Sequence, residues 1–574
     1  MAFLLFIIIA SLLVIAFAEP LGERIGVVAP IILLVVGAAT AFLPQVPDIT
    51  INPEIILQLI LPPLLFSTAM RMPAHDFRRN LGAIFALAVV LVVATALCVG
   101  VVINLLVPQI PLAVAVAVGA VVSPSDAVAV GIVKRAGVSR RIVAILDGEG
   151  LVNDASALVV LGTALLAATQ QVSAPAVVGQ FVWAVAGAVI VGYAVGRLFM
   201  FLRRYVHQPT SNTVLSLAIP FAAYLPAEEI GSSGLVATVA AGLVVAAAAP
   251  RVLSPATRFS DTQTWDTMGL VLESLVFVMM GLQLPALIDA ARTSGFTFLA
   301  TAVVALAVWA TVLVLRTLTM MPLAWTIRRG AGQMQGRAQR LGALGQRLDE
   351  FAQDPRVTSS PRASRRVQSG RARVARGEAD SAYFAAKPLG LRAGAVMVWA
   401  GMRGAVTLAA AQTLPADTPG RSFLILVSFA VAAFSLVVQG GTLSWVVDAL
   451  KPGTDVPSSP EERRRVRAVL SGAAADVEVP SDLARALTAG GLPRGRAPQA
   501  TLLELARAAR DAGVVHQLTD YAVARVVAQR EALLSERDAG RIDASDFDSQ
   551  LRRLDVEQLA IEAQAREYAE RQGA

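Results

Sequence analysis

Ser123-Pro124-Ser125-Asp126-Ala127-Val128 interrupts an apolar run that extends from residue 112 to residue 133. A run of about 20 apolar residues is long enough to cross a lipid bilayer as a helix. Proline removes a backbone donor and disfavours helix at the residue before it, so this span is predicted to break near its middle. Carbonyl groups exposed at such a break can bind a dehydrated cation, provided that they face protein or a water-filled cavity.

The next apolar run, 142–169, contains Asp147-Gly148-Glu149-Gly150-Leu151-Val152-Asn153-Asp154. Gly150 and Asp154 share one helical face at i, i+4, whereas Glu149 and Asn153 share a face turned by about 100°. A hard monovalent cation needs oxygen ligands, and a carboxylate that binds it can bind a proton instead. Asp154 and Asp126 are therefore predicted to bind a cation such as Na⁺ and a proton in competition.

A later run, 389–413, is interrupted in a similar way by Gly401-Met402-Arg403-Gly404-Ala405-Val406. This interruption occupies the same place in the second half of the chain as the proline break does in the first. The pattern predicts inverted repeats in which two discontinuous helices cross at the middle of the membrane. Arg403 is expected to support the crossing by offsetting the carbonyl ends of the broken helices, with snorkelling to the surface as the alternative.

The whole chain has the composition of a membrane protein. Its 574 residues are 55% hydrophobic and 16% charged, with a mean hydropathy of +0.63. The apolar runs predict an all-α membrane protein with about thirteen transmembrane helices. These spans are 2–18, 25–43, 55–70, 81–107, 112–133, 142–169, 175–202, 212–226, 230–249, 267–288, 296–327, 389–413 and 422–449. The first could instead be a signal peptide ending at Ala16-Phe17-Ala18, but it lacks a basic n-region and is interpreted as a helix.

Basic residues alternate between the loops, which predicts the orientation. One side carries Arg24; Arg71, Arg78 and Arg79; Lys134, Arg135, Arg140 and Arg141; Arg203 and Arg204; and Arg251 and Arg258. The other side carries only Arg292 and Arg421. Because positive loops stay in the cytoplasm, the N-terminus is expected outside and the C-terminus inside the plasma membrane, here the bacterial inner membrane.

Two polar segments complete the organisation of the chain. A long loop at 328–388 is strongly basic, with 13 Lys/Arg against 5 Asp/Glu in residues 328–387, which indicates contact with anionic lipid rather than with nucleic acid. The transmembrane domain is expected to cover residues 1–450, this loop included. Residues 451–574 are expected to form a small cytoplasmic α-helical tail, with amphipathic helices at Thr501 to Arg510 and at Leu551 to Tyr568.

Charged residues inside the spans are costly and indicate an ion pathway or a structural pair. They are Asp126, Glu149, Asp154, Glu273, Arg316 and Arg403. Arg316 has no acid on its own helix, so an acid on another helix is expected to pair with it. Glu149 is the preferred partner and Glu273 the alternative.

At these motifs the chain resembles the monovalent cation/proton antiporters of the sodium/hydrogen exchanger and NhaP type. The resemblance covers about residues 20–450 and also includes Ala-Glu-Glu-Ile-Gly-Ser-Ser-Gly at 227–234, Glu-Ser-Leu-Val-Phe at 273–277 and Gln439-Gly440. It implies that Asp126 and Asp154 bind the ion, that Asn153 supports them, that Glu149 pairs with Arg316, and that the protein is a homodimer. Asn153 before Asp154, in place of a second aspartate, resembles the electroneutral branch.

Two departures from the family put the cation selectivity in question. Gly150 stands where a serine is common, and Ser67 stands where an acid often follows Leu-Pro-Pro-x-x-Phe. Water or the Ser125 hydroxyl can supply the missing ligand.

The sequence as a whole predicts a secondary transporter that exchanges Na⁺, or K⁺ or Li⁺, for protons in pH and sodium homeostasis. No cofactor is expected beyond the transported ions. A cation channel and a K⁺-selective antiporter are the alternatives. An enzyme is disfavoured, because His75, His207 and His516 all lie outside the spans and the single cysteine, Cys98, has no partner.

Overall fold

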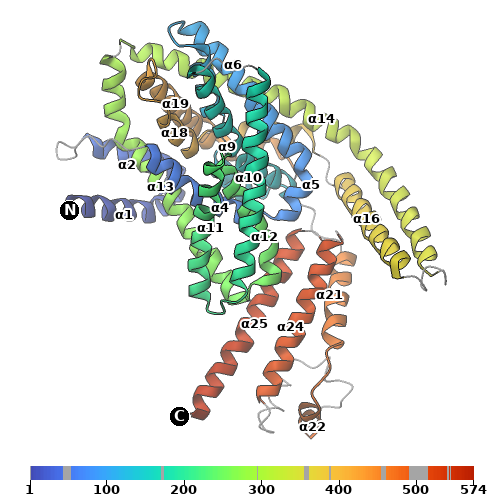
Figure 1. Cartoon of the computed structure of the whole chain (residues 1–574). Helices are drawn as coiled ribbons and strands as arrows, with labels where there is room; N and C mark the ends of the chain where they lie inside the picture. Colours follow the sequence, from blue (N-terminus) through green and yellow to red (C-terminus); the bar gives the residue numbers. More distant parts are fainter. Residues whose placement is uncertain are drawn as a thin grey trace. The chain divides into compact units, whose positions relative to one another are not determined.

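The computed structural model describes residues 2–42, 53–123, 125–169, 174–293, 295–353, 361–386, 389–453, 460–489, 515–539, 542 and 544–573. Throughout these residues the secondary structure is helical, without a strand (Figure 1). The chain divides into two compact units. The first consists of residues 1–328 and 389–455, and the second consists of residues 329–388 and 456–574.

The first unit begins with helices that precede and include the first predicted break. They are α1 (Ala2–Ile25), α2 (Ala29–Ala41), α3 (Pro53–Ile55), the π-helical turn η1 (Ile56–Ile60), α4 (Leu61–Arg71), α5 (Ala74–Phe85), η2 (Ala86–Val90), α6 (Leu91–Leu106), α7 (Leu112–Val121), α8 (Ala127–Arg135) and α9 (Arg140–Thr169). Helix α7 ends at Val121 and α8 begins at Ala127, so the span is discontinuous as predicted. Pro124 itself lies outside the described residues.

The rest of the unit contains the second break. Its helices are α10 (Ala174–Arg203), α11 (Pro209–Glu229), α12 (Gly234–Val252), α13 (Pro255–Thr293), α14 (Phe298–Ala352), α17 (Leu391–Trp399), α18 (Ala405–Gln412), α19 (Arg421–Ser435), η3 (Leu436–Gly440) and α20 (Gly441–Leu450). Residues 400–404 separate α17 from α18, because the segment contains two glycines, which have low helix propensity.

Seven of the described helices are each long and apolar enough to cross a membrane alone. The segment Ile9–Ile25 followed by Ala29–Ala41, bent by 119°, makes an eighth candidate if the pair counts as one span. The other predicted spans correspond to shorter, broken or more polar helices, such as Ile56–Arg71 and Leu112–Val121. The all-α membrane fold is therefore confirmed, while the number of about thirteen spans stays a prediction.

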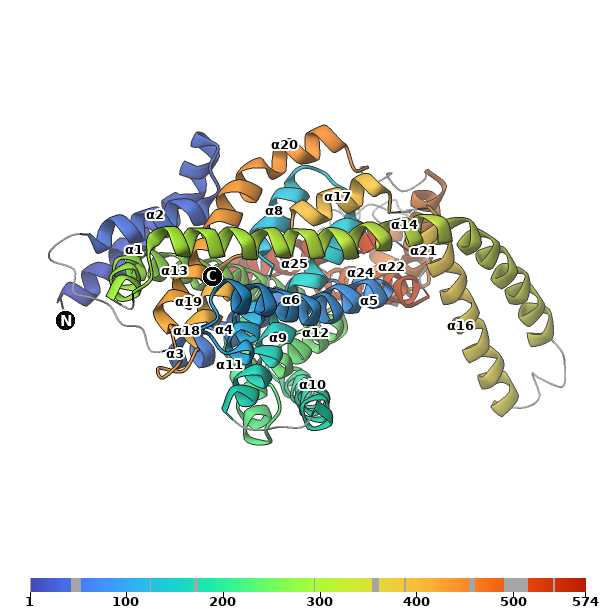
Figure 2. The same ribbon diagram turned by 90° about the horizontal axis from the view of Figure 1, so that it is seen from above.

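Helix α9 lies in the middle of the first unit, in contact with both helices that flank the first break and with α17, which precedes the second. It packs against α5, α7 and α8, and also against α17, α10 and α12. On one flank α2 packs along α13, and on another α8 and α17 both pack beside α20 (Figure 2). Because α9 carries Glu149, Asn153 and Asp154, these contacts place the second acidic motif beside both breaks.

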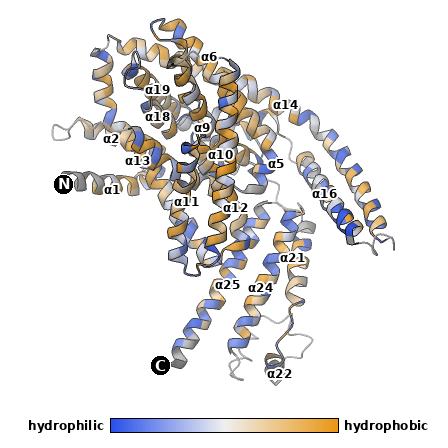
Figure 3. Ribbon diagram, viewed as in Figure 1, coloured by the Kyte–Doolittle hydropathy of each residue, from blue (hydrophilic) through white to orange (hydrophobic). Residues whose placement is uncertain are grey.

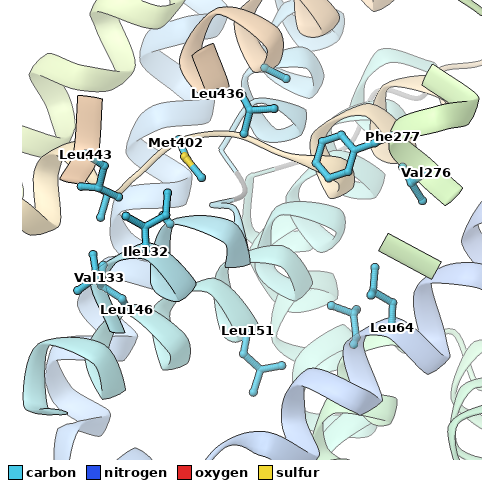
Figure 4. Packing of buried hydrophobic residues seen from close by; sticks show 14 of the residues in the cluster. Leu64, Ile132, Val133, Leu146, Leu151, Val276, Phe277, Met402, Leu436 and Leu443 are labelled. Carbon is cyan, nitrogen blue, oxygen red and sulfur yellow. The ribbon is translucent and has the colours of Figure 1, made fainter. Parts of the chain in front are cut away.

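Apolar side chains fill the space around the breaks. Met402 in the second break belongs to the same buried cluster as Ile132 of α8, Leu151 of α9 and Leu436 of η3 (Figure 4). Figure 3 colours much of α10 as hydrophobic. Large apolar residues of this helix remain exposed, for example Ile190 at 67%. Such exposure fits a surface that faces lipid, where helices satisfy all their backbone groups internally.

The basic segment at 328–388, predicted as a long loop between membrane spans, is mostly helical in its described residues. Helix α14 continues beyond Arg328 to Ala352, and α16 (Pro361–Ala386) follows it. Leu, Ala, Arg and Gln are frequent here and are good helix formers, so high polarity does not prevent a helix. Arg371 of α16 forms an ion pair with Asp349 of α14, so the two segments form a charged hairpin.

The tail in the second unit contains α21 (Pro460–Ala475), α22 (Ser481–Ala489), α24 (Val515–Asp538) and α25 (Ala544–Gly573). Helix α24 packs against α21 and α25 around a small core that includes Leu470, Leu533 and Leu554. The helix predicted from Leu551 to Tyr568 lies within α25 and is part of a longer one. The helix predicted from Thr501 to Arg510 lies outside the described residues.

Candidate ion-binding site

The two helix breaks lie against each other. The backbone N–H of Asp126 donates a hydrogen bond to the carbonyl oxygen of Met402, with 2.9 Å between nitrogen and oxygen. A Cβ atom at position 404 would overlap the carboxyl group of Asp126, so a glycine is needed there. Asp126 also caps α8, because its Oδ1 accepts from the backbone N–H of Val128 at 3.4 Å. The carboxylate therefore sits where the two discontinuous helices cross.

A cavity opens beside this crossing, with about 630 Å³ of space free of protein atoms, part of it open solvent. It is lined by Leu64, Leu65, Thr68, Ser125, Asp126, Val130, Leu146, Asp147, Gly150, Leu151, Asp154, Glu273, Gly404 and Val406. Asp126 and Asp154 are each only 8% exposed. Among the described residues, Oδ1 of Asp154 finds no hydrogen-bond partner. A buried carboxylate oxygen needs a compensating charge or hydrogen bond, which a bound cation or a proton supplies.

The two expected supporting residues occupy different places. Ser125 lines the cavity beside Gly150, and a Cβ at position 150 would lie 3.5 Å from the Ser125 Oγ. Asn153 lies outside the cavity lining and is buried, and its Nδ2 donates to the carbonyl oxygen of Ser123 at 3.2 Å. Asn153 thus connects α9 to the first break through the backbone, while Ser125 can offer its oxygen to an ion.

Glu149 and Arg316 form a fully buried ion pair. Both Nη atoms of Arg316 donate to the Glu149 carboxylate, with 2.9 Å between Nη2 and Oε2. The Nε atom of Arg316 donates to the carbonyl oxygen of Met397 at 3.1 Å. Such a two-pronged pair holds the Glu149 carboxylate in place. Glu273, the other acid considered for Arg316, lines the cavity instead.

Arg403 does not line the ion cavity and does not reach the surface. It is 3% exposed and lines a small separate cavity together with Trp309, Arg316 and Gln439. Its backbone N–H donates to the Ser435 Oγ at 2.9 Å, and its Nη1 donates to the carbonyl oxygen of Gly401 at 2.6 Å. The arginine therefore binds carbonyl oxygen within its own break.

Two further acids line the cavity that the sequence analysis did not assign to the site. Asp147 precedes Asp154 by seven residues, so Asp147, Gly150, Leu151 and Asp154 follow the i, i+3, i+4, i+7 pattern of one helical face, and this spacing could have identified it. Glu273 comes from α13, far away in sequence, and no local pattern links it to α9. Only the packing of α13 shows that it belongs here.

A second buried ion pair escaped the sequence analysis, which counted Arg203 as a loop residue. Arg203 at the end of α10 pairs with Asp261 of α13, and its Nε donates to the Asn212 Oδ1 at 2.5 Å. Thr213 donates to the Asp261 Oδ1 at 3.1 Å. This group is buried and joins the ends of α10, α11 and α13, so Arg203 contributes to packing rather than to a basic surface.

Comparison with known proteins gives the same assignment for most of the chain. The transmembrane sodium/hydrogen exchanger family matches residues 7–449. An uncharacterised Na⁺/H⁺ exchanger of Mycobacterium tuberculosis (strain ATCC 25618 / H37Rv) is 30% identical over 80% of this chain and 77% of its own length. The sodium, potassium, lithium and rubidium/H⁺ antiporter of Bacillus subtilis (strain 168) is 34% identical over 49% of this chain and 44% of its own length.

The fold also resembles that of a solved antiporter structure. The sodium proton antiporter MjNhaP1 from Methanocaldococcus jannaschii matches with a TM-score of 0.55 and 17% sequence identity, over 78% of this chain and 99% of that one. At this identity the likeness concerns the fold, while the family match rests on sequence. Together with the crossed broken helices and the buried acids, these findings show that the chain belongs to the sodium/hydrogen exchanger family of multi-pass membrane antiporters.

Proposed function

We propose that this protein exchanges a monovalent cation, Na⁺ first and K⁺ second, for protons across the membrane. The observation that carries the proposal is the buried Asp154 carboxylate, whose Oδ1 has no partner among the described residues and whose cavity also contains Asp126. Two buried carboxylates at the crossing of two broken helices form a site that a dehydrated cation or a proton can occupy in turn.

The ligands for the cation are oxygen atoms, as a hard ion requires. Asp126 and Asp154 supply carboxylate oxygens and Ser125 supplies a hydroxyl group. Protons compete for the same carboxylates. Exchange should therefore slow as the pH falls on either side, because a protonated Asp154 excludes the cation.

The proposed stoichiometry is one cation for one proton. Asn153 is neutral, and Glu149 is held by Arg316, so neither is expected to exchange a proton during transport. Asp126 is expected to remain ionised or to titrate together with Asp154 as a coupled pair. Asp147 and Glu273 also line the cavity, so a measurement of transported charge tests the proposal directly.

The test uses purified protein in liposomes with a trapped pH indicator. We expect proton movement on addition of Na⁺, a weaker response to K⁺ or Li⁺, and none in empty liposomes. A valinomycin-clamped potential should leave the Na⁺ rate unchanged, because a transported elementary charge would change the driving force by about 2.3 kcal/mol per 100 mV. A rate that follows the potential would reject electroneutral exchange. A cation current without proton movement would support the channel alternative.

The names of the relatives bear on the choice of cation. The antiporter of Bacillus subtilis is named for sodium, potassium, lithium and rubidium, so K⁺ exchange is the second candidate for this chain. Three predictions come from the sequence alone. The basic loops lie on the cytoplasmic side, the protein is a homodimer, and it acts in pH and sodium homeostasis. Crosslinking in membranes tests the dimer, and accessibility of cysteines placed in the loops tests the orientation.

A further inference from the structure

A second, larger cavity lies next to the ion cavity in the first unit. It contains about 1820 Å³ of space free of protein atoms, part of it open solvent, and we call it the vestibule. Its lining includes the acids Glu19, Glu23, Glu273 and Asp448 and the bases Arg71 and Arg135. Glu19, Glu23 and Asp448 are exposed, so they mark the wide part of the vestibule.

Glu273 lines both cavities, and it is the one residue that the described linings of the two share. It lies on α13, one helical turn after Gly269, which packs directly against Ser67 and Arg71 of α4. The carboxylate of Glu273 therefore lies at the boundary between the vestibule and the cavity that contains Asp126 and Asp154.

The guanidinium group of Arg71, which also lines the vestibule, forms an ion pair and hydrogen bonds with other groups. The Nε atom of Arg71 lies 2.9 Å from Oδ1 of Asp266, and its Nη2 donates to the carbonyl oxygens of Trp265 and Asp266 at 3.3 Å each. Glu273 makes no hydrogen bond or ion pair within contact distance of any described residue, although the charge of Arg71 acts on it at longer range. A carboxylate without an ion-pair partner between two cavities is able to bind a cation that passes.

We propose that Glu273 binds the transported cation at this boundary and passes it to Asp126 and Asp154. The inference rests on the proposed exchange function and adds a residue that sets the cation affinity on the vestibule side. A separate observation in the ion cavity also indicates that a cation binds there: the buried Oδ1 of Asp154 has no hydrogen-bond partner among the described residues. Glu273 is thus an entry ligand, whereas Asp154 is the group on which cation and proton compete.

Kinetics in oriented liposomes test this role. In Glu273→Gln we expect the KM for Na⁺ on the vestibule side to rise about tenfold, with the maximal rate within about twofold of wild type, because binding at entry weakens while the exchange site remains. Glu273→Asp should recover part of the affinity. Asp448→Asn, which removes an exposed acid from the vestibule alone, should leave KM almost unchanged and serves as the matched control.

Other results of the same kinetics would overturn the inference. If Glu273→Gln leaves the KM for Na⁺ unchanged on both sides of the membrane, Glu273 does not bind the cation during entry. The proposed exchange function would be unaffected by that result. If the Glu273→Gln variant exchanges more slowly at every Na⁺ concentration, saturating Na⁺ included, Glu273 belongs to the exchange step instead. Absence of exchange in the wild-type protein would reject the proposed function itself, so the two failures are distinguishable.

A labelling experiment keeps the inference testable if Glu273→Gln is unstable. Cys98 is the single cysteine and is exposed, so Cys98→Ser provides a background for Glu273→Cys. A cationic methanethiosulfonate reagent should modify the thiol introduced at position 273 from the vestibule side, and Na⁺ should slow the reaction in a saturable manner. A thiol introduced by Asp448→Cys in the same background should show no saturable protection. Failure of Na⁺ to protect position 273 would overturn the proposal.

Discussion

The first break, between α7 and α8, and the second break, between α17 and α18, interrupt their helices in opposite halves of the chain but carry opposite charges. Asp126 of the first break faces the ion cavity, while Arg403 of the second lines a separate small cavity with Arg316. The second break contributes to the crossing mainly through its backbone, with Met402 accepting from Asp126 and Gly404 packed against the same carboxyl group.

The two breaks therefore have different roles at the site, although both interrupt a helix. The predicted first repeat, which contains α7 to α9, supplies Asp126 and Asp154, whereas the cavity acid Glu273 comes from α13. The predicted second repeat supplies close backbone contact and two arginines buried near the site, Arg316 and Arg403. The two predicted repeats therefore contribute unequal chemistry to the ion cavity, although each contributes a break.

The largest expected effect follows from removal of the acid on α9. Asp154→Asn should reduce exchange to the level of empty liposomes while the protein stays folded, because the variant lacks the group on which cation and proton compete. Asp289→Asn, the same substitution at an exposed acid of α13, should leave exchange near wild type. Near-normal exchange in a folded Asp154→Asn protein would show that cation and proton compete at another group. The difference between the acids of the first repeat and the arginines of the second would then not explain exchange.

A second effect, on stability, concerns the pair that joins α9 of the first repeat to α14 of the second. Glu149→Gln leaves the buried Arg316 without its counter-charge, which typically costs about 3 to 5 kcal/mol. Thermal unfolding should show a clear loss for this variant and a partial recovery when Arg316 is replaced by glutamine as well. Additive losses in the double variant would contradict an energetic coupling between the two.

The smallest effect compares two glycines that line the same cavity. Gly404→Ala places a methyl group on the Asp126 carboxyl group and should lower exchange, whereas Gly150→Ala meets only the Ser125 hydroxyl at van der Waals distance and should have little effect. Initial rates at saturating and at low Na⁺ measure the difference. Equal activity of the two variants would show that the close contact at the second break is dispensable.

The sequence predicted the membrane class and the two helix breaks, because each depends on local chemistry. Apolar runs of about 20 residues, a proline between small polar residues and two glycines around an arginine have few other interpretations in a membrane protein. It did not predict that the basic loop between spans at 328–388 contains α16 and the end of α14. Polarity indicates exposure to water and does not distinguish a loop from a solvated helix.

What the sequence determined by itself is thus the set of elements and the acids on one helix, since Asp154 and its neighbours follow helical spacing. What only the tertiary structure decided is which distant groups meet. The Arg316 side chain could have paired with Glu149 or with Glu273, and its contact with Glu149 depends on how α14 packs against α9. Glu273 lines the ion cavity instead of pairing with Arg316, because α13 packs against α4 there. The physical reason is that a buried charge is compensated by groups close in space, and helix packing sets those distances across more than a hundred residues of chain.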